Sequence, residues 1–374
     1  MNISDVAYVV GGGTPDTTIS EYWDGKIQWF TPSEIGKSKY ISESERKITQ
    51  SGLDNSSAKI LPQGAILLST RATIGECSIA LKECSTNQGF QSLISKNNYN
   101  SEFVYYLMQT KKKELKRNAC GSTFLEISAN EVRKIKCRVP KITEQNKISQ
   151  LLSLIDQRIA TQNKIIKQLQ SLIKGIVVEH YNKSHKTKVK IKDLGKSYSV
   201  MNMSKEDLSE TGNECIIYGE LFTTYDCVAT DVVSKTRKSI QSSTISTGYD
   251  LLFPASTTVD AQSLIAPTAI SQPNIILGGD MFGIVVTNEY NNEYLSYIFN
   301  YIYKNYLAQY AQGSTIIHLH YNDIKNLDIE LPDIKAQNEL VLLLKNIKDK
   351  ILTEKKMLSM LGTQKAYLLR NLFI

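Results

Sequence analysis

The residues that would support metal-dependent hydrolysis lie near the amino terminus. Pro15-Asp16 followed by Glu45-Arg46-Lys47 fits the loose PD…ExK pattern, in which carboxylates hold Mg²⁺ and a lysine helps to activate water. The pattern is short, Asp16 lies in a turn-forming segment, and Glu45 lies in the charged segment "SESERK". The later part of the chain carries no counterpart to it. A Mg-dependent DNA endonuclease therefore remains an alternative and not the main hypothesis.

Other patterns of enzyme chemistry are incomplete. "GKS" occurs at Gly36 and Gly195, but the glycine that a phosphate-binding loop needs five positions earlier is replaced by Thr31 and Lys190. His318 and His320 share one side of a predicted strand without a third metal ligand nearby, and the six cysteines have no zinc-ligand spacing. We predict a chain that is not an enzyme and needs neither metal nor cofactor.

A tandem repeat is the strongest feature of the chain. "GSTFLEISANEVRKIKCRVP" from Gly121 is answered by "GSTIIHLHYNDIKNLDIELP" from Gly313, and the match continues past the proline without a gap. Upstream, "NSEFVYYLMQT" answers "NNEYLSYIFNY", and "GAILLSTRAT" answers "GYDLLFPAST". The chain is a duplication of two half-molecules. The identical pairs of the downstream segment are Gln145/Gln337, Asn146/Asn338, Leu151/Leu343, Leu152/Leu344, Ile155/Ile347, Ile159/Ile351 and Leu169/Leu361.

The composition is that of a folded protein. The 374 residues are 41% apolar and 22% charged, and no apolar run reaches the length of about 18 residues that a membrane span requires. The amino terminus lacks the basic and apolar regions of a signal peptide, so a cytoplasmic location is expected. The formal net charge of +7 permits an acidic partner such as nucleic acid without requiring one.

Each half begins with a globular α/β part. Short β-rich runs such as "GAILLS" and "DLLFPAS" alternate with turn residues, and one amphipathic helix starts at Ser101 in the first half and near Asn292 in the second. The apolar residues of these two helices recur at core spacing.

Each half ends with a long helix that carries a heptad seam. One polar layer, Gln162 or Glu354, interrupts each seam, and matching registers favour packing of the two helices against each other. A duplicated chain usually associates about a pseudo-twofold axis, which makes such helices antiparallel. A helix of about 36 residues is roughly 54 Å long. A coiled-coil scaffold without DNA binding is a second alternative. The seam consists of Ile148, Leu152, Ile155, Ile159, Gln162, Ile166 and Leu169 in the first helix, and of Leu340, Leu344, Ile347, Ile351, Glu354, Leu358 and Leu361 in the second.

The predicted fold class is α/β, with two globular domains separated by two long antiparallel coiled-coil helices and a pseudo-twofold internal repeat. The predicted boundaries are 1–142 for the first domain, 143–182 for the central helix, 183–334 for the second domain and 335–374 for the last helix.

The repeated motifs resemble a known family. "WFTPSEIG", "LPQGAILLSTRATIGECSIA", "NQGFQSLI", "GSTFLEIS" and the P-x-x-x-E-Q-x-x-I motif before the helix are similar to the target-recognition domain and spacer helix of specificity subunits of type I restriction-modification systems. The second half repeats the resemblance with "YGELFTTY", "GYDLLFPAST", "LGGDMFGIV", "GSTIIHLH" and P-x-x-x-A-Q-x-x-L, so it covers nearly the whole chain.

The resemblance implies a non-catalytic DNA-specificity subunit. In this family each domain reads one half of a bipartite target in double-stranded DNA, and the helices set the gap and dock two methyltransferase (M) subunits, with restriction/translocase (R) subunits joining through the complex. No membrane is involved. "STRATIG" from Ser69 aligns with "PASTTVD" from Pro254, which has no arginine. Because the two segments differ, the two domains should read different sequences and the target should be asymmetric.

The candidate DNA contacts are side chains able to bind bases or phosphates. Arg71 is the best candidate for a base contact, and His318 contacts DNA more plausibly than metal. For each candidate a structural role such as a solvated lysine, an ion-paired arginine or a turn cap is the alternative. The set is Lys37, Lys39, Tyr40, Thr70, Arg71, Thr73, Ser122 and Thr123 in the first domain, and Lys235, Arg237, Lys238, Ser256, Thr257, Thr258, Ser314, Thr315 and His318 in the second.

Overall fold

The computed structural model describes residues 1–121 and 125–373. The chain divides into two compact units: unit 1 is Met1–Asn163 with Lys356–Ile374, and unit 2 is Lys164–Lys355. Within the described residues, no helix is both long enough and apolar enough to span a membrane.

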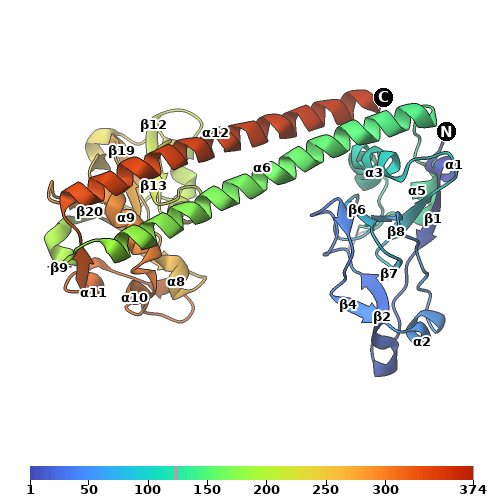
Figure 1. Cartoon of the computed structure of the whole chain (residues 1–374), viewed down its shortest axis with the longest axis horizontal. Helices are drawn as coiled ribbons and strands as arrows, with labels where there is room; N and C mark the ends of the chain where they lie inside the picture. Colours follow the sequence, from blue (N-terminus) through green and yellow to red (C-terminus); the bar gives the residue numbers. More distant parts are fainter. Residues whose placement is uncertain (122–124, 374) are drawn as a thin grey trace. The chain divides into compact units, whose positions relative to one another are not determined.

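Unit 1 contains a five-stranded and a three-stranded sheet (Figure 1). The larger sheet has the order β1-β8-β5-β6-β3, and the smaller has the order β4-β2-β7. The strands are β1 (Ala7–Gly11), β2 (Trp23–Phe30), β3 (Tyr40–Ile41), β4 (Arg46–Ile48), β5 (Ile66–Leu68), β6 (Cys77–Ala80), β7 (Cys84–Thr86) and β8 (Gln91–Ser95). The helices are α1 (Ile3–Val6), α2 (Gln50–Asp54), α3 (Ser101–Thr110), α4 (Lys112–Arg117) and α5 (Ala129–Lys134), with a 3₁₀ turn η1 at Ser20–Tyr22.

Unit 2 contains two five-stranded sheets and two short ribbons. The orders are β10-β20-β16-β18-β13, β11-β14-β12-β19-β15, β17-β21 and β22-β9. The strands are β9 (Thr187–Lys190), β10 (Gly195–Ser199), β11 (Leu208–Ser209), β12 (Asn213–Ile217), β13 (Val228–Ala229), β14 (Ser234–Thr236), β15 (Thr244–Thr247), β16 (Asp250–Pro254), β17 (Ser256–Thr257), β18 (Thr268–Ile270), β19 (Pro273–Gly278), β20 (Met281–Val286), β21 (Ile317–His318) and β22 (Asp328–Leu331). The helices are α7 (Glu220–Thr223), α8 (Ala261–Leu264), α9 (Asn292–Tyr301), α10 (Lys304–Ala308) and α11 (Tyr321–Ile324), with 3₁₀ turns η2 (Ile191–Leu194), η3 (Lys205–Asp207) and η4 (Ile240–Ser242).

The two units are built on the same sheet. Strands β1, β8, β5, β6 and β3 of unit 1 correspond in order and direction to β10, β20, β16, β18 and β13 of unit 2, including the parallel pairing at one edge. The smaller sheet is also duplicated, because β2 pairs antiparallel with β4 and parallel with β7, as β12 does with β14 and β19. The predicted α/β class with an internal repeat is confirmed.

The shared register aligns the two halves at single residues. Ser69 pairs with Phe90, and Pro254 pairs with Met281, the first residue of the equivalent strand. Ser69 therefore corresponds to Pro254, and the second half has one additional residue between its turn glycine, Gly248, and β16. Both turn glycines, Gly64 and Gly248, have positive φ (86° and 94°), which accounts for the residue type at that turn.

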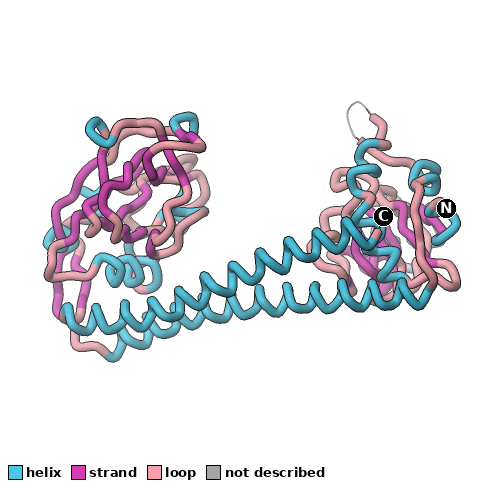
Figure 2. The backbone as a smooth tube through the Cα atoms, turned by 90° about the horizontal axis from the view of Figure 1, so that it is seen from above, coloured by secondary structure: helices cyan, strands magenta, loops and turns pink. Residues whose placement is uncertain are grey.

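Two long helices, α6 (Ile142–Lys183) and α12 (Ile334–Leu372), contribute to both units (Figure 2). In unit 1 the last turns of α12 return to the beginning of α6, because Leu368 and Leu372 pack on the cluster that contains Ile148 and Leu152. In unit 2 the end of α6 lies beside the beginning of α12, because His180 and Leu340 line one shallow depression. Within each unit the two helices therefore run in opposite directions. The heptad positions are all buried or partly buried, and the polar residues Gln162 (5% exposed) and Glu354 (6% exposed) are among the most buried.

The beginning of each long helix is fixed by the same hydrogen bonds, which explains the identical residues of the repeat. Gln145 Oε1 accepts from the Asn100 N–H (3.0 Å) while its Nε2 donates to the Pro140 carbonyl (2.8 Å), and Asn100 Nδ2 donates to Asn146 Oδ1 (2.9 Å). We call these residues the helix clamp. In unit 2 the clamp is Asn291, Gln337, Asn338 and Pro332, with distances of 2.9, 2.8 and 2.8 Å in the same order.

Candidate nucleic-acid interface

In unit 1 the candidate base contact Arg71 lies on a loop that follows β5, the central strand of the main sheet. The Thr70 N–H donates to the Gly89 carbonyl (2.8 Å), and the Ile127 N–H donates to the Thr70 carbonyl (3.2 Å), which fixes the loop on both sides. Arg71 then pairs with Glu126 in an antiparallel bridge, and its Nε lies 2.8 Å from Glu126 Oε2. The side chains are 42% and 36% exposed, so the guanidinium is oriented by the carboxylate and still faces solvent.

The backbone of this loop is strained. Ala72 adopts φ of 53°, a left-handed conformation that a residue with a Cβ rarely takes. Such strain is retained where surrounding contacts enforce it, and it is common at binding sites. Here the neighbouring hydrogen bonds of Thr70 hold the loop and present Arg71 in one orientation.

Unit 2 has the same backbone arrangement with different side chains. The Ala255 N–H donates to the Asp280 carbonyl (2.8 Å), and the Leu319 N–H donates to the Ala255 carbonyl (2.9 Å). The next residue, Ser256, pairs with His318 in the β17–β21 ribbon. Ser256 and His318 therefore stand where Arg71 and Glu126 stand in unit 1. We call these two pairs the reading pairs.

A cleft of about 1120 Å³ opens beside the reading pair of unit 2. Its walls combine polar side chains of the β17 loop with exposed apolar groups, namely Tyr218 (36% exposed), Val259 (71%) and Ile316 (49%). The cleft also contains two lysines. Its residues from the predicted set are Ser256, Thr257 and Thr258, and the residues that sequence reasoning missed include Lys205, Tyr218, Val259, Lys304 and Ile316.

Two predicted residues of unit 1 have polar groups that are already bound to other protein groups, although Tyr40 is 39% exposed. Lys39 is 9% exposed, and its Nζ donates to Glu102 Oε2 (2.8 Å), the Tyr106 hydroxyl (3.1 Å) and Ser153 Oγ (3.1 Å). The Tyr40 hydroxyl donates to the other Glu102 oxygen, and burial together with that carboxylate raises the pKa of Tyr40 to about 12. We leave Lys39 and Tyr40 out of the proposed interface because their polar groups already attach the sheet to α3 and α6.

The remaining candidates of unit 1 differ in their accessibility. Thr70 is fully buried, and its Oγ1 donates to the Gly89 carbonyl (3.0 Å), so its role is to hold the loop. Thr73 and Lys37 are exposed. Ser122 and Thr123 lie outside the described residues.

The remaining candidates of unit 2 lie in two places. Ser314 and Thr315 are exposed in the turn that precedes β21. Lys235 and Arg237 are exposed on and directly after β14, outside the cleft, whereas Lys238 pairs with Asp207 (3.1 Å).

The residues of the PD…ExK pattern are held in separate local contacts. Asp16 accepts from the Thr18 N–H (2.9 Å) in a turn, the Glu45 N–H donates to Glu34, and the Arg46 guanidinium lies 3.5 Å from the centre of the Trp23 ring. Residues 1–121 and 125–373 contain no group of three His, Cys, Asp or Glu side chains arranged to hold a metal ion.

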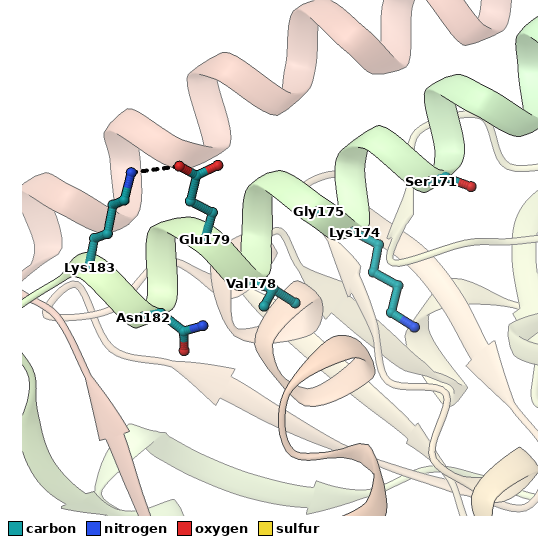
Figure 3. A pocket seen from close by; sticks show the side chains of 7 residues that line it. All are labelled: Ser171, Lys174, Gly175, Val178, Glu179, Asn182 and Lys183. Atoms are coloured by element: carbon teal, nitrogen blue, oxygen red, sulfur yellow. Dashed lines mark hydrogen bonds and ion pairs between the residues drawn. The ribbon is translucent and has the colours of Figure 1, made fainter.

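The long helices offer a second kind of surface. Leu151 and Leu343 occupy the same position of the two long helices, and both side chains are exposed (43% and 49%). In unit 2 a shallow depression of about 620 Å³ follows α6 past Gly175, whose missing side chain leaves open space (Figure 3). Glu179 and Lys183 form an ion pair (2.6 Å) at its rim.

Comparison with known proteins places this geometry in a family. The model of the type I restriction modification DNA specificity domain matches residues 1–171 and again residues 183–361. The chain is 40% identical over 174 residues to the type I restriction enzyme MjaIX specificity subunit of Methanocaldococcus jannaschii, and 27% identical over 161 residues to the EcoR124I/EcoR124II specificity subunit of Escherichia coli. These matches cover 45% and 41% of this chain and 40% of each relative's length.

Solved structures share the whole fold. The S subunit of the type I restriction-modification system from M. genitalium superimposes with a TM-score of 0.60 at 15% identity, over 100% of this chain and 95% of the other. A chain from a study of complex assembly and conformational transition of the type I restriction-modification system gives 0.61 at 13% identity, over 99% and 96%. Two matched copies of the domain model, relatives that are specificity subunits and not catalytic subunits, and a shared fold lead to one conclusion: the chain belongs to the family of type I restriction-modification DNA specificity subunits.

Proposed function

We propose that this chain is the non-catalytic subunit that selects the DNA target of a type I restriction-modification complex. Each globular part reads one half of a bipartite target in double-stranded DNA. The observation that carries the proposal is the reading pair: one backbone frame occurs in both units and presents Arg71 with Glu126 in one and Ser256 with His318 in the other. A conserved frame with different side chains is what two half-sites of unlike sequence require.

The side chains of the reading pairs match the chemistry of base edges. Arginine donates two hydrogen bonds to O6 and N7 of guanine, and a carboxylate accepts from N4 of cytosine. The Arg71–Glu126 pair is therefore suited to a G·C base pair. Ser256 and His318 offer a weaker and more adaptable pattern, and the apolar wall of the unit 2 cleft suits the methyl group of thymine. The expected target is asymmetric.

Phosphate contacts fall to exposed or partly exposed cations of the two globular parts. Lys37 in unit 1, and Lys205, Lys304, Lys235 and Arg237 in unit 2, are the candidates for this role, together with the exposed hydroxyls of Ser314 and Thr315. Such contacts position the protein on DNA and do not select the sequence. They should lower the affinity as salt rises, with a slope of about 0.9 per neutralised phosphate.

The long helices set the gap between the half-sites and dock two methyltransferase subunits. Support comes from Leu151 and Leu343, because the same exposed apolar residue at equivalent positions of a duplicated chain suits two copies of one partner. Restriction and translocase subunits join through that complex.

Mapping of methylated adenines tests the proposal. A host without other methyltransferases receives the methyltransferase partner with or without this chain, and methylated positions are located across the genome. A split motif with a fixed gap that depends on the chain is the expected result. Absence of such a motif while the complex forms, together with no salt-sensitive binding of duplex DNA by the complex, favours the scaffold alternative.

A further inference from the structure

In both units the globular part meets the long helices at one equivalent contact, and one helix charge of that contact is reversed between the units, from Asp156 to Lys348. Contact 1, in unit 1, consists of Lys39, Glu102, Tyr106, Asp156 and Lys365. Contact 2, in unit 2, consists of Cys227, Glu293, Tyr297, Lys348 and Ile173.

In contact 1 the helix supplies the acid. Asp156 of α6 accepts a hydrogen bond from the Tyr106 hydroxyl (2.6 Å), and its other oxygen lies 2.7 Å from Lys365 Nζ of α12. The globular part supplies the cation, because Lys39 donates to the same Tyr106 hydroxyl and to Glu102. Asp156 and Lys365 are only 20% and 21% exposed, so the network is largely removed from solvent.

The sheet register and the repeat give the equivalent residues in contact 2. The Lys39 carbonyl accepts from the Ile79 N–H as the Cys227 carbonyl accepts from the Ala269 N–H, so Cys227 stands in place of Lys39. Asp156 corresponds to Lys348 and Lys365 to Ile173, because each pair is separated by the interval that separates Gln145 from Gln337. Tyr106 and Glu102 keep their residue types as Tyr297 and Glu293.

In contact 2 the helix supplies the cation. Lys348 lines a cavity of about 380 Å³ together with Asp226, Cys227 and Tyr297. Burial lowers the pKa of Lys348, whereas the charges of Glu293, Asp226 and Asp349 raise it. Cys227 and Ile173, which replace the cations Lys39 and Lys365 of contact 1, are buried (3% and 5% exposed). In contact 2 the cation is instead Lys348 of the helix.

We propose that the reversed charges assign each globular part to its own helix segment. If the first globular part is placed on the second segment, Lys39 meets Lys348. If the second part is placed on the first segment, Asp226 meets Asp156, and the cation of Lys39 is replaced by Cys227. Like charges at partly buried positions are unfavourable, whereas both native arrangements bring opposite charges together. The inference needs the proposed function only for its consequence, which is that the order of the two half-sites is kept.

The first test compares variants of the full-length chain that reverse a charge with variants that only remove it. Asp156→Lys and Lys348→Asp are compared with the neutral variants Asp156→Asn and Lys348→Gln by urea unfolding without DNA. Each reversal should raise the unfolding equilibrium constant of its unit by about tenfold more than the matched neutral variant does. Equal effects of reversal and removal at both sites overturn the proposal.

Transfer of the contact 2 residue types into unit 1 distinguishes an electrostatic loss of stability from a general disruption of the fold. Adding Lys39→Cys and Lys365→Ile to Asp156→Lys reproduces the residue types of contact 2, and it should recover most of the loss caused by Asp156→Lys alone. A triple variant that is less stable than Asp156→Lys contradicts the electrostatic origin of the effect.

A chimera tests the assignment directly. A chain in which residues 183–332 are replaced by a second copy of residues 1–140 places Lys39 beside Lys348. In this chimera a second copy of α3 replaces α9. Lys348→Asp removes the repulsion from Lys39 and adds an attraction, so it should slow hydrogen exchange in that helix. Lys348→Gln only removes the repulsion and should slow exchange less. If Lys348→Asp leaves exchange unchanged or faster, the charges do not assign the globular parts. None of these measurements involves DNA, so their failure is distinguishable from failure of the proposed function.

Discussion

At the scale of single residues, the molecule separates groups that hold the fold from groups free to meet a partner. Thr70 and Arg71 are neighbours in the chain, yet Thr70 is fully buried on the Gly89 carbonyl while Arg71 is oriented by Glu126 and remains half-exposed. An arginine held by one carboxylate loses less conformational entropy on binding than a free one. Under the proposed function, the reading pair of unit 1 is oriented for a base edge before DNA binds.

Replacement of Arg71 should affect one position of the target. Arg71→Ala removes a forked donor, so we expect a loss of about 1 to 3 kcal/mol in discrimination at one base pair of one half-site. Lys37→Ala, the matched control for a phosphate contact, should weaken binding of all sequences and reduce the salt slope by about one. Methylation motifs and duplex titrations measure both effects. Uniform weakening by Arg71→Ala would show that Arg71 contacts phosphate and not a base.

His180 gives unit 2 a dependence on pH. Burial lowers the pKa of the ring from 6.5, although the backbone of Ala336 and the charge of Glu339 act in the opposite direction. The folded chain then binds fewer protons than the unfolded chain just below that value. The stabilisation is present above pH 6.5 and is lost as the pH falls through the interval down to the folded pKa.

His180→Phe keeps a ring beside Tyr294 and removes the titration. The free energy of unfolding of the unsubstituted chain should fall more between about pH 7.5 and about pH 5 than that of the variant. Urea unfolding at both pH values measures the difference. Parallel pH profiles for the two proteins would assign the acid sensitivity to other groups.

At the scale of elements, the helix clamp decides how each long helix leaves its globular part. Gln145 and Gln337 are 1% and 0% exposed, and each satisfies one backbone N–H and one backbone carbonyl. Both clamps tie the N-cap residue of the short helix, Asn100 or Asn291, to the first turns of the long helix. The angle of the helix is thus fixed by hydrogen bonds and not only by apolar packing.

Loss of the clamp should be costly in either half. Gln145→Ala or Gln337→Ala leaves buried backbone groups unpaired, so we expect about 2 to 4 kcal/mol of destabilisation. Asn146→Ala removes an exposed hydrogen bond at the same place and should cost under about 1 kcal/mol. Denaturant unfolding of the three variants gives the comparison. A Gln145→Ala chain as stable as the Asn146→Ala chain is incompatible with this role.

The outer faces of the helices should carry the partner. Leu151→Asp and Leu343→Asp each place a charge on an exposed position, so folding should be nearly unaffected and one methyltransferase copy should be lost per substitution. The mass of the complex with the methyltransferase subunit measures the stoichiometry, and the exposed Met360 serves as a control position through Met360→Asp. Retention of two copies in both leucine variants would locate docking elsewhere.

At the scale of the whole molecule, duplication accounts for function with two parts. Both units repeat the order and direction of their sheets, and they differ at the reading pairs and at the contacts with the helices. Under the two proposals above, variation at the reading pairs distinguishes the half-sites, and variation at the contacts keeps each globular part on its own helix segment. Exchange of one globular part should therefore be tolerated only if its contact with the helices is exchanged as well.

Residues 1–142 are replaced by the equivalent part of another specificity subunit, and positions 156 and 365 of contact 1 are exchanged with it. This replacement should change one half of the methylated motif and leave the other half and the gap unchanged. Methylation mapping checks the outcome, with a replacement of residues 183–334 as the reciprocal control. A change in both halves, or in the gap, would contradict independent reading by the two parts.

The sequence by itself determined the features that depend on local pattern and repetition. Heptad spacing predicted the long helices, alternating apolar runs and turn residues predicted the α/β class, and the repeat predicted two half-molecules of the same organisation. The clamp residues Gln145 and Asn146 were already visible as identities with Gln337 and Asn338, although their hydrogen bonds were not.

Only the tertiary structure decided which polar residues are free. Lys39 carries the same side chain as an exposed lysine, but its partners Glu102 and Ser153 lie 63 and 114 residues away in the chain. Arg71 meets Glu126 through a sheet register that no local spacing encodes, and the same holds for Ser256 and His318. Periodicity reports the surface a residue lies on, whereas a charged group's role depends on which opposite charge the folded chain brings beside it.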